Sequence, residues 1–218
     1  MSDAEDWARE AERMVAEIPD VPARIARAMR AVPRHWFVPS EYRREAYEDE
    51  PLPLPHGDAT ISAPHMVALQ LEYLALEPDL KVLEVGSGSG YLAALIAELT
   101  APEGRVFGID IDSRLVRDAR RRLDTTTWGG RIALKLGDGR EGWREEAPFD
   151  RIVVSCATPE LYETWRGQLR HPGILVAPVG SSSSQDLVRY VTGPGGGTIE
   201  RGPACRFVPL RGRLPSDI

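Results

Sequence analysis

The sequence predicts an α/β fold in which helices and strands alternate around a mainly parallel sheet. Three observations support this prediction. Short apolar runs alternate with amphipathic segments between residues 81 and 178, a glycine-rich turn follows the first of these runs, and 42% of the 218 residues are hydrophobic. Short buried strands separated by amphipathic helices are typical of a parallel sheet with helices on both faces. We therefore expect a Rossmann-like architecture.

The first 80 residues are expected to form a helical arm that covers a cleft of the sheet. Charged and apolar residues alternate at helical spacing over 3–18, where a proline ends the pattern, and again over 22–31. Residues 34–55 are rich in proline and aromatic residues, which suits an ordered, irregular segment packed over another surface. A third helix is expected over 64–76.

Residues 81–180 are expected to form the Rossmann-like core. Each apolar run in this segment is short enough for a strand, and the segments between the runs show helical periodicity. The expected strands are 81–85, 105–109, 131–136, 151–155 and 174–178, and the expected helices are 91–100 and 114–123.

Residues 181–218 are expected to form a C-terminal antiparallel hairpin and a strand that contacts the substrate. Turns rich in serine or glycine flank a strand at 186–191, and a further strand is expected over 199–210. Since no helix follows the glycines of 193–197, they predict a hairpin tip rather than a phosphate loop. The three segments are expected to form one structural domain.

Charge excludes one class of partner. The formal charge is -6, and the one dense basic run is Arg120–Arg122, which suits the solvated end of a helix. Proteins that hold nucleic acid through many phosphate contacts need clustered Lys and Arg, so no nucleic-acid partner is expected.

Neither a membrane nor a metal is expected as a partner. The chain contains no apolar stretch of the ~20 residues that a membrane span needs, and its first ten residues are acidic, so we expect a cytoplasmic protein. Cys156 and Cys205 are too few and too far apart for a disulfide framework or a thiolate zinc site. A monomer is expected because no long apolar stripe stays exposed in the pattern.

The glycine-rich turn indicates which cofactor the fold binds. Gly86, Gly88 and Gly90 are spaced Gly-x-Gly-x-Gly, and Tyr91 stands where a dinucleotide-binding turn requires its third glycine. With Glu84 two positions before the first glycine, this pattern favours S-adenosylmethionine and disfavours NAD. The candidate cofactor-binding residues of this turn are Glu84, Gly86, Ser87, Gly88 and Ser89.

Two further carboxylates follow expected strands at the same open edge of the sheet. Asp110, followed by Ile111, could accept hydrogen bonds from the ribose hydroxyls, or it could cap a helix, as Asp112 could equally do. Asp138 could accept from the adenine amino group while the Gly139 amide donates to the ring, or the pair could form a plain turn. All four residues are candidate cofactor-binding residues.

The sequence resembles the protein-L-isoaspartate O-methyltransferase family from about residue 32 onward. The glycine turn marks methyltransferases in general, whereas the segment at 58–66 is far more specific to this family. The segments that carry the resemblance are VPRHWFVP at 32–39, DATISAPHM at 58–66, GDG at 137–139, EAPFD at 146–150 and FVPL at 207–210.

The resemblance implies a reaction and a set of site residues. Members of the family transfer the methyl group of S-adenosylmethionine to the α-carboxylate of an isoaspartyl residue, and the ester closes to a succinimide that reopens partly to aspartate. Substrates would be isoaspartyl- or aspartyl-containing peptides and proteins. The resemblance implies Ser62 as the active-site serine, Thr60 and Ile61 on the cofactor side, and Ala59, His65, Ala157, Val208, Pro209 and Leu210 on the substrate side, with Cys156 and Thr158 replacing the more usual alanines.

The chemistry requires no general base, because a carboxylate is already ionised at pH 7. Ser62 would orient the carboxylate by donating a hydrogen bond, although it could also cap the helix that begins near Pro64. His65 could equally be a structural histidine. Two other functions remain open: methylation of an aspartate in one dedicated, ribosomally made peptide to give an aspartimide, and a non-catalytic nucleoside-binding module.

Overall fold

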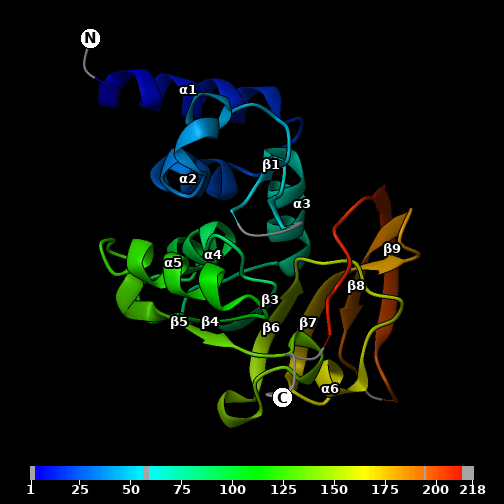
Figure 1. Cartoon of the computed structure of the whole chain (residues 1–218). Helices are drawn as coiled ribbons and strands as arrows, with labels where there is room; N and C mark the ends of the chain where they lie inside the picture. Colours follow the sequence, from blue (N-terminus) through cyan, green and yellow to red (C-terminus); the bar gives the residue numbers. More distant parts are fainter. Residues whose placement is uncertain (1–2, 56–58, 194, 213–218) are drawn as a thin grey trace.

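The computed structural model describes residues 3–55, 59–193 and 195–212. Within these residues a seven-stranded sheet has the order β5-β4-β3-β6-β7-β8-β9 (Figure 1). The first five strands in this order run parallel, and β8 and β9 continue the sheet antiparallel, as the sequence predicts. The strands are β3 Lys81–Val85, β4 Arg105–Asp110, β5 Ile132–Leu136, β6 Phe149–Val154, β7 Leu169–Gly180, β8 Gln185–Val191 and β9 Thr198–Cys205.

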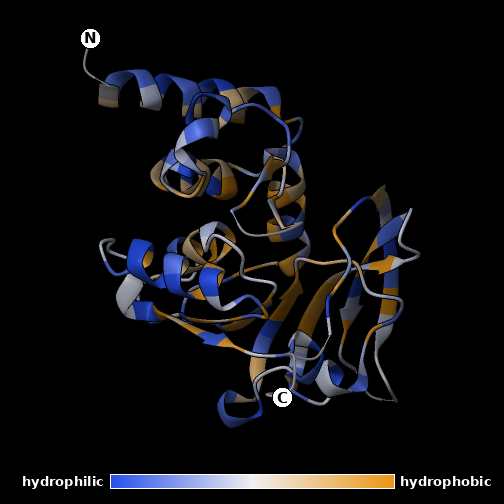
Figure 2. Ribbon diagram, viewed as in Figure 1, coloured by the Kyte–Doolittle hydropathy of each residue, from blue (hydrophilic) through white to orange (hydrophobic). Residues whose placement is uncertain are grey.

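The central strands form because their apolar residues are buried on both faces. In β3, Val82, Leu83 and Val85 have no exposed surface. Figure 2 shows β3, β6 and β7 as hydrophobic, whereas the outer side of α5 is hydrophilic. Val85 pairs with Ile109 of β4 and Val154 of β6, so these strands end at one edge. This is the edge at which the sequence places the candidate cofactor residues.

The long helices of the core share one face of the sheet. They are α3 (Pro64–Leu74), α4 (Tyr91–Leu99) and α5 (Ser113–Leu123), and their apolar side chains belong to one hydrophobic cluster. On the other face, a second cluster is covered by the four-residue helix α6 (Glu163–Arg166), whose Trp165 is fully buried. Helices were expected on both faces, and among the described residues α6 is the α-helix that covers this second face.

The N-terminal arm holds a short ribbon over the core. Helices α1 (Asp3–Glu17) and α2 (Ala23–Ala31) lie at one end of the molecule, away from the sheet (Figure 1). The 3-10 helices η1 (Arg34–Trp36) and η2 (Ser40–Glu45) follow. Strands β1 (Leu52–Pro53) and β2 (Thr60–Ile61) then pair antiparallel, so the arm fixes the backbone of Thr60 and Ile61.

The last strand differs from its predicted bounds. Strand β9 ends at Cys205 rather than at Leu210, and the segment 207–210 leaves the sheet and returns to its open edge. There Ala157 donates its N–H to the carbonyl of Val208 at 2.8 Å and accepts from the N–H of Leu210 at 2.8 Å. These two hydrogen bonds hold the segment against Ala157, which is distant in sequence. The segment therefore leaves the sheet although its residues favour a strand.

Two predicted features include residues that the structure does not describe. Gly195, Gly196 and Gly197 have positive φ values, as a tight hairpin tip between β8 and β9 requires, whereas Pro194 lies outside the described residues. Asp58 of the family-specific segment also lies outside them. The division of the chain at residues 80 and 180 stays a prediction. None of the described helices is both long and apolar enough to cross a membrane.

Candidate active site

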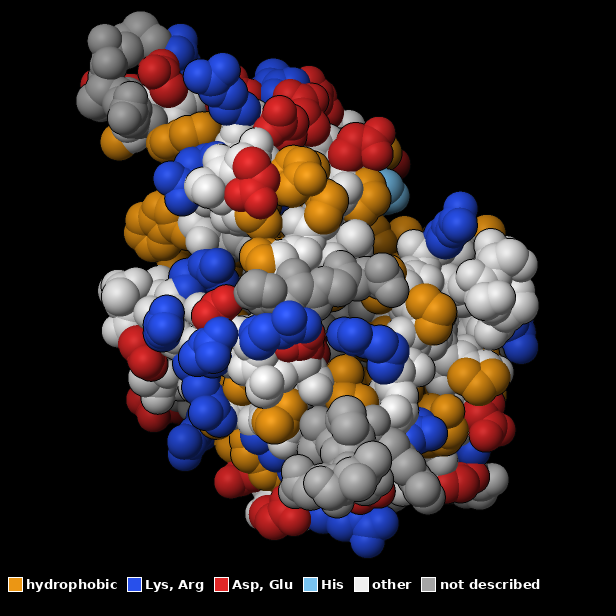
Figure 3. Space-filling view, in the orientation of Figure 1, with side chains coloured by type: hydrophobic (Ala, Val, Ile, Leu, Met, Phe, Trp, Pro, Cys, Tyr) orange, Lys and Arg blue, Asp and Glu red, His pale blue; other side chains and the backbone are white. Residues whose placement is uncertain are grey.

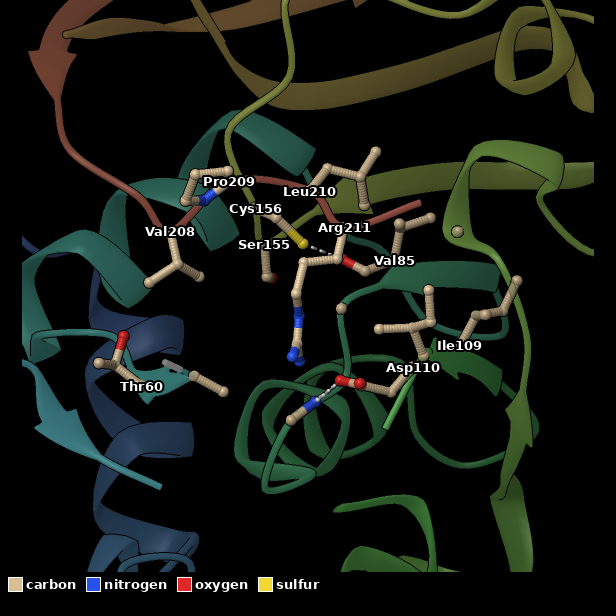
Figure 4. Close-up of a pocket in the computed structure, with 15 residues that line it drawn as sticks. Thr60, Val85, Ile109, Asp110, Ser155, Cys156, Val208, Pro209, Leu210 and Arg211 are labelled. Atoms are coloured by element: carbon tan, nitrogen blue, oxygen red, sulfur yellow. Dashed lines mark hydrogen bonds between the residues drawn. The ribbon is translucent and has the colours of Figure 1, made fainter. Parts of the chain in front are cut away.

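A cavity of about 190 Å³, open to solvent, lies where β3, β4 and β6 end (Figure 4). The walls come from distant parts of the chain, which the fold brings to one edge of the sheet. They are formed by Ala59, Thr60, Val85, Gly86, Gly88, Ile109, Asp110, Ile111, Gly139, Ser155, Cys156, Val208, Pro209, Leu210 and Arg211.

The glycine turn presents bare backbone to this cavity. Gly86 has φ +84°, and a Cβ there would lie 2.5 Å from the sulfur of Cys156. The N–H of Gly86 donates to the carbonyl of Ile109 at 2.8 Å, which ties the turn to β4. Because no side chain fits at this position, a ligand can approach the backbone closely.

Asp112, and not Asp110, caps the helix α5, which was one of the two roles that the sequence left open for Asp110. Asp112 is the N-cap of α5, where its side chain accepts from the N–H of Arg114 at 2.9 Å. Asp110 instead lines the cavity and accepts from the N–H groups of Gly88 at 2.9 Å and Asp112 at 3.0 Å. Burial raises the pKa of Asp110 above its ordinary value of 3.8. Its carboxylate can also accept from ribose hydroxyls.

A smaller chamber of about 40 Å³ adjoins the cavity at the glycine turn. It shares Thr60, Gly86, Gly88 and Ser155 with the main cavity. It is lined as well by the remaining candidates of the turn and of the family-specific segment: Ile61, Ser62, Glu84, Ser87 and Ser89.

The polar atoms of this chamber fit a polar ligand. Within the described part of the chain, four residues that line it carry a buried side-chain atom without a hydrogen-bond partner, which is costly unless a ligand or water satisfies it. Glu84 is 1% exposed, and burial, followed by the charge of Asp110, raises its pKa well above 4.5. The four atoms are Gln70 Oε1, Glu84 Oε2, Ser87 Oγ and Ser155 Oγ.

Ser62 is not a helix cap. The N-cap of α3 is Ala63, and Pro64 occupies the first turn of the helix, so the alternative structural role for Ser62 is wrong. Ser62 instead lines the smaller chamber beside the glycine turn. The catalytic role that the family resemblance implies for Ser62 stays a prediction.

Three candidate residues line neither the cavity nor the smaller chamber. His65 pairs with Asp49, with Nδ1 2.8 Å from Oδ2, which supports its structural interpretation. Asp138 caps a 3-10 turn and pairs with Arg140 at 2.5 Å, so the structure places Gly139 but not Asp138 in the cavity wall. Ala157 acts through its backbone, since it holds the segment 207–210 in place. Polar contacts in the tertiary structure and backbone hydrogen bonds decided these positions, and residue spacing could not predict them.

Sequence reasoning missed several wall residues. Ser155 and Cys156 follow β6 directly, so their position after a parallel strand was the available signal, whereas nothing in the sequence marks Arg211. Burial, followed by the charges of Asp110 and Glu84, raises the pKa of Cys156 to about 12. The thiol therefore stays protonated and is a poor nucleophile. Both cysteines are unpaired, and within the described residues no cluster of three or more metal-ligating side chains occurs.

Comparison with known proteins agrees with the geometry. The family described as protein-L-isoaspartate(D-aspartate) O-methyltransferase matches residues 13–214. The protein-L-isoaspartate O-methyltransferase of Hyperthermus butylicus is 45% identical and covers 95% of this chain and 91% of its own. That of Methanothrix thermoacetophila is 46% identical and covers 93% of this chain and 95% of its own.

Two solved structures superpose on most of this chain. A protein-L-isoaspartate O-methyltransferase superposes with a TM-score of 0.84 at 26% identity, over 93% of this chain and 66% of the other. A β-aspartate methyltransferase from Plasmodium falciparum, in complex with S-adenosyl-L-homocysteine, superposes with a TM-score of 0.81 at 26% identity, over 94% of this chain and 98% of the other. The chain belongs to the protein-L-isoaspartate(D-aspartate) O-methyltransferase family.

Proposed function

We propose that this enzyme transfers the methyl group of S-adenosylmethionine to the α-carboxylate of L-isoaspartyl residues, the first step of their repair through a succinimide. The observation that carries this proposal is the meeting of three distant segments at one cavity. The glycine turn, the segment 59–62 and the segment 208–210 line the cavity and the chamber beside it, at the open edge of the sheet. The relatives above bear the isoaspartate name and do not support the dedicated-peptide alternative.

The residues around the cavity fit the cofactor. The Asp110 carboxylate would accept from the ribose hydroxyls, and the bare backbone at Gly86 and Gly88 would lie against the methionyl part. The Gly139 amide, in the same wall, would face the adenine. When bound, the cofactor supplies an electrophilic methyl group on a sulfonium. Asp138 remains a candidate for the adenine amino group, because its carboxylate, though paired with Arg140, keeps further acceptor sites.

Ser62 would position the substrate rather than activate it. The substrate carboxylate is already ionised at neutral pH, so it needs orientation and removal of its water shell, not a base. The Ser62 hydroxyl would donate a hydrogen bond to one carboxylate oxygen and leave the other aligned for attack. Val208, Pro209 and Leu210, held by Ala157, would wall the cavity beside the peptide. Good alignment of this kind can contribute roughly 7–11 kcal/mol.

The test uses two short peptides that differ only in isoaspartate or aspartate, with methyl transfer followed by mass spectrometry and methanol release. We expect methylation of the isoaspartyl peptide alone. Ser62→Ala should lower kcat about 10-fold or more with cofactor affinity retained, because the carboxylate is no longer held in line with the methyl group. Ser183→Ala, in the exposed turn before β8, is the matched control. Equal methylation of both peptides would refute the proposal.

We further propose a monomeric, cytoplasmic enzyme without a nucleic-acid or membrane partner. On the face shown in Figure 3, basic side chains are interspersed with acidic ones. Within the basic run at the end of α5, Arg120 donates to the carbonyl of Leu134 at 3.1 Å and Arg122 to that of Ser89 at 3.0 Å. Arginines that donate to backbone carbonyls stabilise the fold and are poorly placed to bind the phosphates of a nucleic acid. Light scattering after size exclusion should give the mass of one chain.

A further inference from the structure

Arg211 extends from the end of the segment 208–210 into the cavity. Figure 4 shows its side chain crossing the space between the Cys156 side and the Asp110 side. Among the described residues that line the cavity, it is the one with a cationic side chain, and Asp110 is the one with a carboxylate. A cation in this position faces both the cofactor space and the wall assigned to the substrate.

The backbone that carries Arg211 is anchored at several points. The N–H of Phe207 donates to the side chain of Gln185 at 2.8 Å, and Val208 and Leu210 bond to Ala157. The backbone that leads to Arg211 is therefore fixed up to Leu210, while the residue Arg211 itself is exposed.

The guanidinium is not required to satisfy the carboxylate on the opposite wall. Both oxygens of Asp110 already accept backbone N–H groups, at 2.9 and 3.0 Å. The positive charge of Arg211 nevertheless acts on both walls. It lowers the pKa of Asp110 and of Cys156, although burial raises both pKa values by more. Arg211 can thus offer its N–H groups to an anion that enters from the open side.

We propose that Arg211 binds the α-carboxylate of the isoaspartyl substrate and selects this anion over the neutral methyl ester. This inference rests on the proposed function. A planar guanidinium matches a carboxylate through two parallel N–H bonds, and such charge-assisted bonds are about twice as strong as neutral ones. The ester product has lost the charge, so the same contact weakens after transfer and favours product release.

The kinetic signature differs from that of Ser62. The carboxylate loses charge as its oxygen bonds to the methyl carbon, so Arg211 stabilises the bound substrate at least as well as the transition state. An interaction of this kind appears in KM and not in kcat. Arg211 is accordingly a specificity-determining residue.

The test compares Arg211→Gln with Arg206→Gln, which removes an exposed arginine of the same C-terminal segment that does not line the cavity. Two peptides are used: the isoaspartyl substrate and its α-carboxamide, a neutral isostere assayed as a competitive inhibitor. For Arg211→Gln we expect KM to rise about 10-fold, with kcat and the Kd of S-adenosylmethionine within about twofold of wild type. The Ki of the carboxamide should not change, and Arg211→Lys should recover part of the loss.

Three results would overturn the inference. An unchanged KM would show that Arg211 does not contact the carboxylate. An equal rise in KM and in the carboxamide Ki would indicate that Arg211 contacts the peptide but does not distinguish the charged carboxylate from the neutral amide. A lower Kd for S-adenosylmethionine in Arg211→Gln would show that the arginine competes with the cofactor at Asp110. A wild-type enzyme inactive on the isoaspartyl peptide would instead refute the proposed function, whatever the variants do.

Discussion

Asp110 and Asp112 are two residues apart and serve different purposes at the residue scale. Asp112 caps α5, and Asp110 lines the cavity. Asp110→Asn should raise the Kd of S-adenosylmethionine about 10-fold or more, because one carboxylate oxygen that accepts a hydrogen bond is replaced by a donor. Asp112→Asn is the matched control, since Asn caps helices as well as Asp does. Calorimetric titration measures both, and similar losses in the two variants would contradict the ribose role.

The ionisation of Asp110 gives the same prediction a pH dependence. Since burial raises its pKa above 3.8, the carboxylate protonates at a higher pH than an ordinary aspartate. Protonation removes acceptors for the ribose hydroxyls, so cofactor affinity should fall as the pH drops, with a midpoint above 3.8. Asp110→Asn should show a flatter profile over the same range.

Burial of Glu84 lowers the free energy of unfolding, and the same side chain gives the chamber a polar surface. Its pKa in the folded protein lies well above the ordinary 4.5, because burial penalises the carboxylate. An unfolded chain ionises this group from about pH 4.5 upward, whereas the folded chain resists, so the free energy of unfolding falls as the pH rises through that window. Glu84→Gln removes this penalty. We expect a higher Tm than wild type at pH 7 and a difference that narrows toward pH 4.5, measured by scanning calorimetry; a lower Tm at pH 7 would contradict it.

At the scale of elements, the glycine turn is the most sensitive piece of backbone. Gly86→Ala would place a Cβ 2.5 Å from the sulfur of Cys156 at a φ of +84°. We expect the turn to shift and the Kd of S-adenosylmethionine to rise at least about 10-fold. Gly130→Ala is the control, because a Cβ there meets nothing within 4 Å. Affinities measured by titration should separate the two variants, and a silent Gly86→Ala would show that close backbone approach is not required.

Two elements that local patterns do not reveal complete the site. The ribbon of β1 and β2 pairs Leu52 with Ile61 and so fixes the segment that leads to Ser62. The return of the segment 207–210 depends on Gln185 and Ala157, both far away in sequence. Strand periodicity predicted a longer β9 here, because side-chain alternation cannot indicate where a strand leaves its sheet.

At the scale of the whole molecule, the cofactor should stabilise the fold, because its site joins the sheet, the arm and the C-terminal segment. At 100 times its Kd, S-adenosylmethionine should add about 2.7 kcal/mol to the free energy of unfolding. For a chain of this size that raises Tm by about 5–10 °C. NAD at the same concentration should leave Tm unchanged. Thermal unfolding followed by fluorescence tests this, and a larger shift with NAD would reject the cofactor assignment.

The sequence by itself determined the parallel core, the antiparallel C-terminal strands, the glycine turn and the family. These follow from short-range signals: residue periodicity, the spacing of Gly86, Gly88 and Gly90, and family segments such as that at 58–66. Only the tertiary structure decided that Asp112 rather than Asp110 caps α5, that His65 pairs with Asp49, and that Arg211 enters the cavity. Such outcomes depend on contacts between residues far apart in the chain, whose energies no local pattern contains.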